Sequence, residues 1–214
     1  MKIYIVRHGE TLANKKGVLQ GTLDTPLSEL GLSLAHKTGV GLKDIHFDIC
    51  FTSPLDRALN TAKIILEENN FKDTKLVKED AIKEMNMGDW EGLPFKGDTP
   101  IPVDQSEMFF TNPFNLKPIP NGETTLEVCE RTQKFLFDLV KENKYENVLI
   151  STHGFATRAL LNFMYENKED FWQGHVPYNC AVNIIEYKDG EFKFIAQDKI
   201  FYDKDQIFDH YSIK

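Results

Sequence analysis

The chain has 214 residues, of which 41% are hydrophobic, enough to bury the core of one domain. Its net charge of −8 argues against a nucleic-acid partner, because phosphate backbones bind basic surfaces. No apolar run is long enough for a membrane span or a signal-peptide core, so we expect a cytoplasmic protein without membrane attachment. Three widely separated cysteines, Cys50, Cys129 and Cys180, lack the spacing of a metal or disulfide framework and are expected to be buried.

Strands and helices alternate along the first half of the chain. A compact apolar run predicts a strand at 2–6, and the polar stretch 10–27 predicts an ordered loop. Ser28 is expected to cap a helix extending to about residue 42. A strand at 47–52 is followed by Ser53-Pro54, which predicts a helix start with Ser53 as its cap, ending near residue 68.

The second half continues the same alternation. A strand at 76–78 precedes Glu84, and a helix with a capping box is predicted at 124–143. A further strand at 147–152 leads into a helix at 155–165. Asp189-Gly190 predicts a hairpin between strands at 182–187 and 191–196.

This order predicts an α/β protein: a three-layer α/β/α sandwich with a largely parallel central sheet. Residues 93–121 stand apart, because they hold six of the nine prolines together with four phenylalanines. A linker does not normally carry so many large aromatic residues. We interpret the stretch as an inserted flap that packs over a site, with a plain surface excursion as the alternative.

Two histidines directly follow predicted strands, His8 after the first and His153 after the strand at 147–152. In open α/β sheets, ligands bind beyond the carboxyl ends of the strands. Either histidine alone is compatible with an inert structural role, but the pair favours a shared site. Arg7 adjoins His8, and Arg57 falls in the first turn of a predicted helix. An anion clamp and a surface ion pair with Asp56 or a neighbouring acid are both open interpretations of Arg57.

Short blocks of sequence then occur in a fixed order. They are Arg7-His8-Gly9-Glu10-Thr11 with Asn14; Gln20-Gly21, Asp24, Pro26-Leu27 and Gly31; Ser53-Pro54-Leu55-Asp56-Arg57-Ala58 with Thr61-Ala62; Glu84 with Gly88 and Trp90-Glu91-Gly92; Pro120-Asn121-Gly122-Glu123-Thr124 with Arg131; and Thr152-His153-Gly154. This series resembles the signature of the histidine phosphatase superfamily, also called phosphoglycerate mutase-like. The resemblance implies that fold for a single domain over 1–214, with the flap at about 93–121, and no metal or cofactor.

The resemblance also implies roles for the matching positions. His8 is the expected nucleophile, which becomes transiently phosphorylated, and Glu84 is the expected general acid and base. The remaining expected residues bind the phosphoryl group or line the pocket: Arg7, Arg57 and a protonated His153 as the clamp, with Asn14, Gly154, Gln20 and Gly21 assisting. A neutral imidazole is a competent nucleophile near pH 7, and cationic side chains stabilise the phosphoryl charge without magnesium.

Two departures favour a phosphatase of small phosphomonoesters over a cofactor-dependent phosphoglycerate mutase. The stretch 93–121 contains no arginine, only Lys96 and Lys117, whereas the mutases carry adjacent arginines there. Phe155 follows the second His-Gly, where mutases place asparagine. The mutase remains the alternative. A catalytically inactive scaffold of the same fold is a less favoured alternative, because the two histidines and Glu84 are all present.

Overall fold

The computed structural model of the chain describes residues 1–207. In this range six strands form one sheet in the order β3-β2-β4-β1-β5-β6. The four strands β1 to β4 are parallel where they pair. At one edge of the sheet β5 pairs antiparallel with β1, and β6 pairs antiparallel with β5. The strands are β1 (Lys2–Arg7), β2 (Ile49–Thr52), β3 (Lys75–Lys78), β4 (Asn147–Thr152), β5 (Val182–Lys188) and β6 (Glu191–Lys199).

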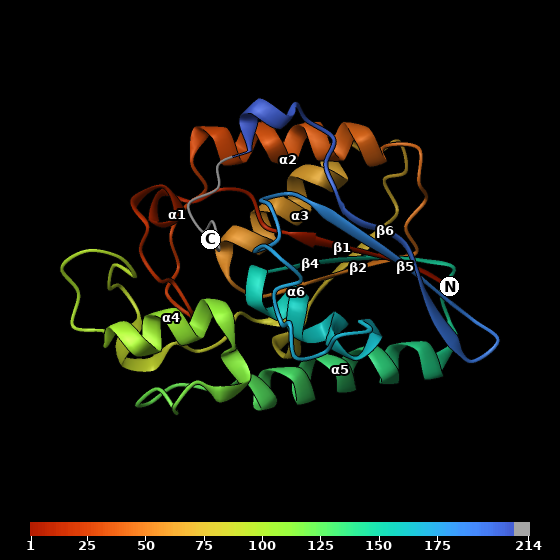
Figure 1. The fold of residues 1–214 in the computed structure, drawn as a ribbon. Coiled ribbons are helices and arrows are strands. Elements are labelled where there is room, and N and C mark those ends of the chain that lie inside the picture. The colour runs from red at the N-terminus through yellow and green to blue at the C-terminus, as the bar shows by residue number, and fades with distance from the viewer. Residues whose placement is uncertain (208–214) are drawn as a thin grey trace.

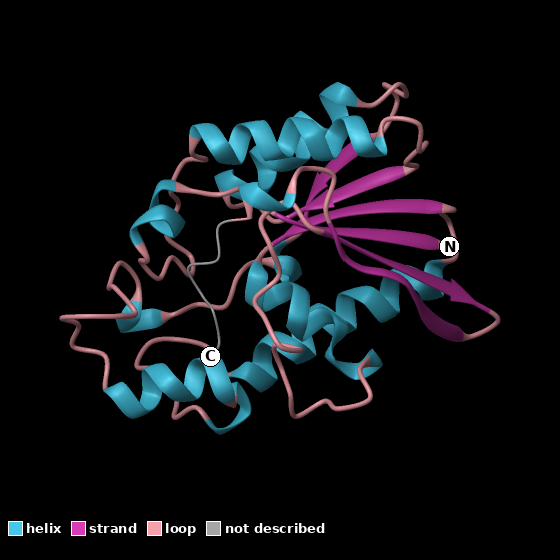
Figure 2. Ribbon diagram, turned by 45° about the horizontal axis from the view of Figure 1, so that its top comes forward, coloured by secondary structure: helices cyan, strands magenta, loops and turns pink. Residues whose placement is uncertain are grey.

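Helices cover both faces of this sheet, which confirms the predicted α/β/α sandwich with a largely parallel sheet. Two helices, α2 and α3, lie on one face, and α5 and α6 lie on the other (Figure 1). Figure 2 shows the sheet between these two layers. The helices are α1 (Leu12–Lys16), α2 (Glu29–Leu42), α3 (Asp56–Glu68), α4 (Val103–Thr111), α5 (Thr125–Glu142) and α6 (Gly154–Leu161).

The sequence explains why these elements form. The central strands β1 and β4 bury five consecutive residues each, as expected for strands covered on both faces. The Ser28 hydroxyl accepts from the Gly31 amide at 3.0 Å and caps α2, and Thr124 and Glu127 form the predicted capping box of α5. The β5–β6 hairpin turns at Asp189-Gly190, both with positive φ.

The structure corrects the predicted helix cap at Ser53. Helix α3 begins only at Asp56, its N-cap position is Leu55, and no side chain caps it. The Ser53 hydroxyl accepts a long hydrogen bond of 3.3 Å from the Leu55 amide and faces His153 instead. Ser53, although it precedes a proline, therefore lies at the end of β2 and does not cap a helix. The loop predicted at 10–27 also contains the short helix α1.

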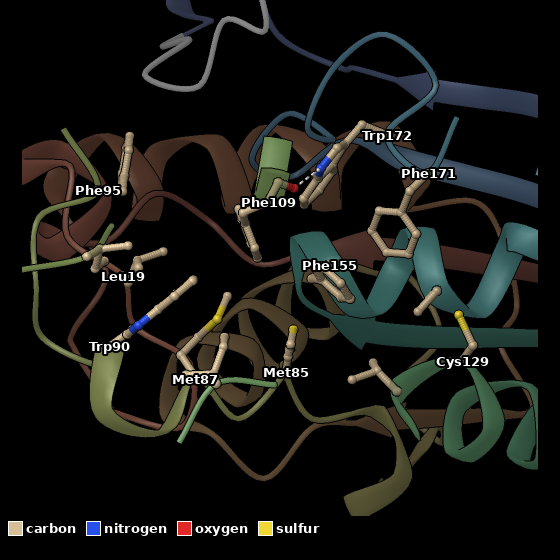
Figure 3. Close-up of a cluster of buried hydrophobic side chains, with 14 residues drawn as sticks. Leu19, Met85, Met87, Trp90, Phe95, Phe109, Cys129, Phe155, Phe171 and Trp172 are labelled. Atoms are coloured by element: carbon tan, nitrogen blue, oxygen red, sulfur yellow. Dashed lines mark hydrogen bonds between the residues drawn. The ribbon is translucent and has the colours of Figure 1, made fainter. Parts of the chain in front are cut away.

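The stretch 93–121 forms α4 and a 3₁₀ turn at Pro113–Asn115. Its Phe109 stacks on Phe155 of α6 with the ring centroids 5.6 Å apart. The carbonyl of Phe109 accepts a hydrogen bond of 2.8 Å from the Trp172 indole nitrogen (Figure 3). These aromatic contacts pack α4 against α6 beside the carboxyl ends of the strands.

All three cysteines are buried and unpaired, as predicted. Across residues 1–207, no helix is both long and apolar enough to cross a membrane.

Candidate active site

The two histidines lie at the same edge of the sheet. Strands β1 and β4 pair in parallel with Arg7 opposite Thr152, so the residues that follow them, His8 and His153, emerge side by side. Their ring centroids are 5.1 Å apart and the ring planes meet at 61°. The prediction that the two histidines meet at the carboxyl ends of their strands is confirmed.

His8 is held as a neutral imidazole. Its Nδ1 lies 2.7 Å from the Gly9 carbonyl oxygen. Because a carbonyl only accepts, Nδ1 carries the proton and Nε2 keeps its lone pair. Burial, followed by the nearby charges of Arg57 and Arg7, lowers the pKa of His8 well below 6.5. The Asn179 side chain donates to the His8 carbonyl at 3.0 Å and fixes the backbone. This protonation state is the one that a nucleophile requires.

Close packing against α2 fixes the turn after His8. The Gly9 amide donates to the Thr61 hydroxyl at 3.0 Å. A β-carbon on Gly9 would lie 2.5 Å from the Gly31 carbonyl oxygen, and one on Gly31 would lie 2.0 Å from the Glu10 carbonyl oxygen. Both positions therefore require glycine, since either side chain would push the His8 turn away from α2.

His153 is fully buried, and its Nε2 forms a hydrogen bond of 2.8 Å with the Ser53 hydroxyl. Its Nδ1 has no hydrogen-bond partner among the described residues. Burial and then the charge of Arg57 lower the pKa of His153 well below 6.5. A protonated His153 in the phosphoryl clamp stays a prediction, since a bound anion would have to offset this lowered pKa.

Arg57 is 1% exposed and lies in the first turn of α3. Its terminal nitrogens donate to the carbonyls of Leu23 at 2.7 Å and Gly21 at 2.6 Å. Its acidic neighbour is Asp24, at 3.6 Å, and not Asp56. The alternative of an ion pair with a nearby acid therefore holds for Asp24, but Arg57 is buried and not on the surface. The Arg57 Nε, also buried, has no hydrogen-bond partner among the described residues. Like the Nδ1 of His153, it is a buried donor position compatible with a bound anion.

Arg7 and Glu84 complete the charged groups around His8. Arg7 is 5% exposed and donates to the Pro177 carbonyl. The Glu84 carboxylate accepts from the amides of Ala156 at 3.0 Å and Met85 at 3.1 Å through Oε1, and from Phe155 at 3.3 Å through Oε2. The positive amino terminus of α6 therefore holds the carboxylate. Its Oε2 has the single, longer bond.

The remaining candidate side chains are buried beside α1. Gln20 accepts through Oε1 from the hydroxyls of Thr11 at 2.9 Å and Thr25 at 2.6 Å. Asn14 accepts from the Thr11 amide at 3.1 Å within the capping box of α1. Gly21 has a φ of +52°, and a β-carbon there would lie 2.2 Å from a Glu91 carboxylate oxygen. These residues form one wall of the site.

One pocket beside His8 brings most of the candidates together. Arg7 and Arg57 are its only cations among the described residues, and Glu84 is its only acid. The other predicted site residues on its wall are His8, Asn14, Gln20, Gly21 and Gly154; His153 lies against His8. The rest of the lining is apolar: Val18, Leu19, Met87, Phe109, Phe110, Phe155, Trp172 and Val176.

Several of these contacts lie outside the sequence-based predictions. The sequence predicts a helix cap at Ser53 and no role for the segment that carries Trp172, Val176 and Asn179. The polarity of Asn179 beside an apolar strand was the one available signal, and Trp172 offered only its aromatic character. Within residues 1–207, no group of three or more histidine, cysteine, aspartate or glutamate residues has the arrangement of a metal site.

The chain is similar to known proteins in sequence and in fold. The model of the histidine phosphatase superfamily (branch 1) matches residues 3–198, and the chain belongs to that superfamily. Uncharacterized phosphatase PhoE of Bacillus subtilis (strain 168) is 33% identical over 182 residues, which cover 85% of this chain and 86% of that protein.

Other similar proteins bear the names of different activities. A 2,3-bisphosphoglycerate-dependent phosphoglycerate mutase of Methylobacterium sp. (strain 4-46) is 33% identical over 163 residues, covering 74% of this chain and 78% of the mutase. The solved structure of Bacillus stearothermophilus YhfR has a TM-score of 0.82 at 28% identity and covers 93% of this chain and 97% of its own. Relatives are thus named both phosphatases and mutases, and the chemistry of this pocket must distinguish them.

Proposed function

We propose that the protein is a metal-independent phosphatase of small phosphomonoesters that works through a phosphohistidine on His8. The observation that carries the proposal is the state of His8: its Nδ1 donates to the Gly9 carbonyl, which leaves Nε2 as the nucleophilic atom in a pocket with two arginines. The proposal treats the chain as one domain, with the stretch 93–121 as the flap over this pocket.

In the first step, Nε2 of His8 attacks phosphorus, and a nitrogen–phosphorus bond forms as the ester oxygen–phosphorus bond breaks. Arg7 and Arg57 stabilise the charge on the transferring group. His153 joins them when it binds the phosphoryl oxygens through Nδ1, since a bound anion favours the protonated imidazole. Glu84 donates a proton from Oε2 to the leaving oxygen.

In the second step, water attacks the phosphohistidine. The Glu84 carboxylate takes a proton from the water, the nitrogen–phosphorus bond breaks, and inorganic phosphate leaves. The two steps together consume one water and release one alcohol and one phosphate. Glu84 ends in the state in which it began, and no step needs a metal ion because the two arginines supply the positive charge.

The apolar lining supports hydrolysis of esters whose leaving groups carry little charge. A phosphoglycerate mutase must hold a substrate carboxylate as well as a phosphate, but Arg7 and Arg57 are the only cations among the described residues of the pocket lining. Lys96 and Lys117 of the proposed flap are not part of it, and Lys117 lies 3.7 Å from Asp104. We therefore favour the phosphatase over the mutase.

Hydrolysis of p-nitrophenyl phosphate in excess EDTA tests the proposal. We expect turnover by the wild type, loss of at least about 10³-fold in His8→Ala, and little change in His36→Ala, an exposed histidine paired with Glu68. Rapid quenching with ³²P-labelled substrate should trap an acid-labile label on the wild type but not on His8→Ala. Full activity of His8→Ala would refute the nucleophile. Faster isomerisation of 3-phosphoglycerate than hydrolysis would instead establish the mutase.

A further inference from the structure

Arg131 lies on α5, outside the pocket, and each of its five N–H groups has an acceptor. The Nε and one terminal nitrogen donate to the two carboxylate oxygens of Glu123, at 2.8 and 3.0 Å. The remaining donors reach three backbone carbonyls, those of Ala81 at 2.8 Å, Lys83 at 2.8 Å and Glu84 at 3.0 Å. A guanidinium has five N–H groups, so its hydrogen-bonding capacity is used up on this one segment and on Glu123.

These carbonyls belong to a stretch that has little regular structure of its own. A 3₁₀ turn ends at Ile82, and no helix or strand includes residues 83–87. Buried backbone acceptors outside regular structure need other donors. The Thr152 hydroxyl supplies one for Ile82 at 2.7 Å. Four consecutive carbonyls, from residue 81 to residue 84, therefore accept from side chains of α5 and β4.

The same pair holds the chain on the other side of Glu84. The Glu123 carboxylate, while bound to Arg131, accepts from the Asn86 amide at 2.8 Å. The backbone is thus held by hydrogen bonds before Glu84, at Glu84 and after it. The side chain of Glu123 is 26% exposed. Among the described residues, the hydrogen-bond donors to the Glu84 carboxylate are the backbone amides of Met85, Phe155 and Ala156. Its position therefore depends on where the backbone at 84 and 85 lies relative to the start of α6.

We propose that Arg131, together with Glu123, is the positioning residue for Glu84 and sets the efficiency of proton transfer to the leaving group. This inference rests on the proposed role of Glu84 as general acid. Arg131 does not touch the substrate. It acts through the backbone of 81–84, and misplacement of an acid by about 1 Å can cost on the order of 100-fold in rate.

The choice of substrate separates this role from a purely structural one. The nitrophenolate of p-nitrophenyl phosphate leaves readily without a proton, whereas the alkoxide of benzyl phosphate does not, and the two rings are similar in size. An acid that is lost or misplaced therefore slows benzyl phosphate more. The value of kcat/KM is the quantity to compare, because it reports the transfer to His8 even when hydrolysis of the phosphohistidine limits kcat.

The experiment measures the ratio of kcat/KM for benzyl phosphate to that for p-nitrophenyl phosphate. We expect Glu84→Gln to lower the ratio by about 10² or more, and Arg131→Lys by about tenfold. Glu123→Gln, a milder change, should lower it in the same direction and serves where Arg131→Lys does not fold. In the Glu84→Gln background, Arg131→Lys should leave the ratio unchanged. The matched control is Arg158→Lys, a buried arginine paired with Asp198 at 2.7 Å, which should affect both substrates equally.

The outcomes separate the two proposals. A normal ratio for Glu84→Gln would remove Glu84 as the acid, and the positioning role with it. A lowered ratio for Glu84→Gln with normal ratios for folded Arg131→Lys and Glu123→Gln would overturn the positioning role alone. A further fall of the ratio when Arg131→Lys is added to Glu84→Gln would mean that Arg131 acts by another route and would also overturn it.

Discussion

A hydrogen bond of 2.8 Å joins the imidazole of His153 to the hydroxyl of Ser53. The two residues follow β4 and β2, which are neighbours in the sheet. Since Ser53 engages Nε2, the Nδ1 of His153 is the ring nitrogen left for a ligand. The serine therefore determines how the second histidine presents itself to a bound phosphoryl group.

Replacement of Ser53 by alanine should release this ring. We expect a fall in kcat/KM of about tenfold, because a buried partner left without its hydrogen bond costs about 1–3 kcal/mol. Steady-state kinetics with p-nitrophenyl phosphate measures it. Ser28→Ala is the control: Ser28 caps α2, and its loss should cost about 1 kcal/mol of stability with a smaller effect on kcat/KM. Equal kinetic effects of the two changes would contradict the role of Ser53.

The buried histidines predict how stability depends on pH. The pKa values of His8 and His153 are lowered in the folded protein, so below about pH 6.5 the unfolded chain binds protons that the folded protein does not. The free energy of unfolding should therefore fall as the pH drops below 6.5, by up to about 1.4 kcal/mol per pH unit for each histidine, until the folded pKa is reached. Urea unfolding at a series of pH values measures the slope, and His8→Asn should reduce it. Parallel curves for the two proteins would refute the assignment.

The aromatic wall of the pocket predicts substrate preference. Phe110 lines the pocket, whereas Phe114, from the same segment, packs on Phe171 with the ring centroids 5.7 Å apart. We expect Phe110→Ala to lower kcat/KM for aryl phosphates by about tenfold through lost apolar contact, with a smaller effect on a short aliphatic phosphomonoester. Phe114→Ala should leave this selectivity unchanged. The measurement is the ratio of kcat/KM for an aryl phosphate to kcat/KM for the aliphatic phosphomonoester, compared between Phe110→Ala and Phe114→Ala.

Gly31 should tolerate no side chain. A β-carbon there would lie 2.0 Å from the Glu10 carbonyl oxygen, so Gly31→Ala must displace the turn that follows His8. We expect a loss of about 1–3 kcal/mol in the free energy of unfolding together with a fall in kcat. The exposed Ser33 of the same helix provides the control Ser33→Ala, which should change neither. Retained stability and turnover in Gly31→Ala would show that the turn is more adaptable than its packing indicates.

Local signals in the sequence were sufficient for most of the fold. Apolar runs marked the central strands because those strands are buried on both faces, and the caps at Ser28 and Thr124 marked their helices because capping depends on residues a few positions apart. The prediction of a helix cap at Ser53 was wrong because it relied on the same kind of local pattern. Its hydroxyl has a partner 100 positions away, and no short-range pattern contains that information.

The candidate site likewise has a part that the sequence predicts and a part that only the tertiary fold creates. The family resemblance predicted His8, His153 and Glu84 as site residues, and their position after a strand also indicated the two histidines. The structure brings the three residues together. The lowered pKa of His153 could not be predicted, because it depends on burial and on the nearby charge of Arg57. Nor could the contact of Arg7 with Pro177, which joins residues 170 positions apart. Contacts of this kind are created by the tertiary fold.

The position of β4 also bears on when the protein gains its activity during synthesis. Within residues 1–207, strand β1 pairs only with β4 and β5, both of which come after residue 146. A ribosome that has translated as far as residue 140 has therefore delivered His8, Arg57 and Glu84 on a chain in which β1 has no paired strand. His8, the proposed nucleophile, and His153 can therefore come together only after β4, which joins the two halves of the sheet, has been synthesised.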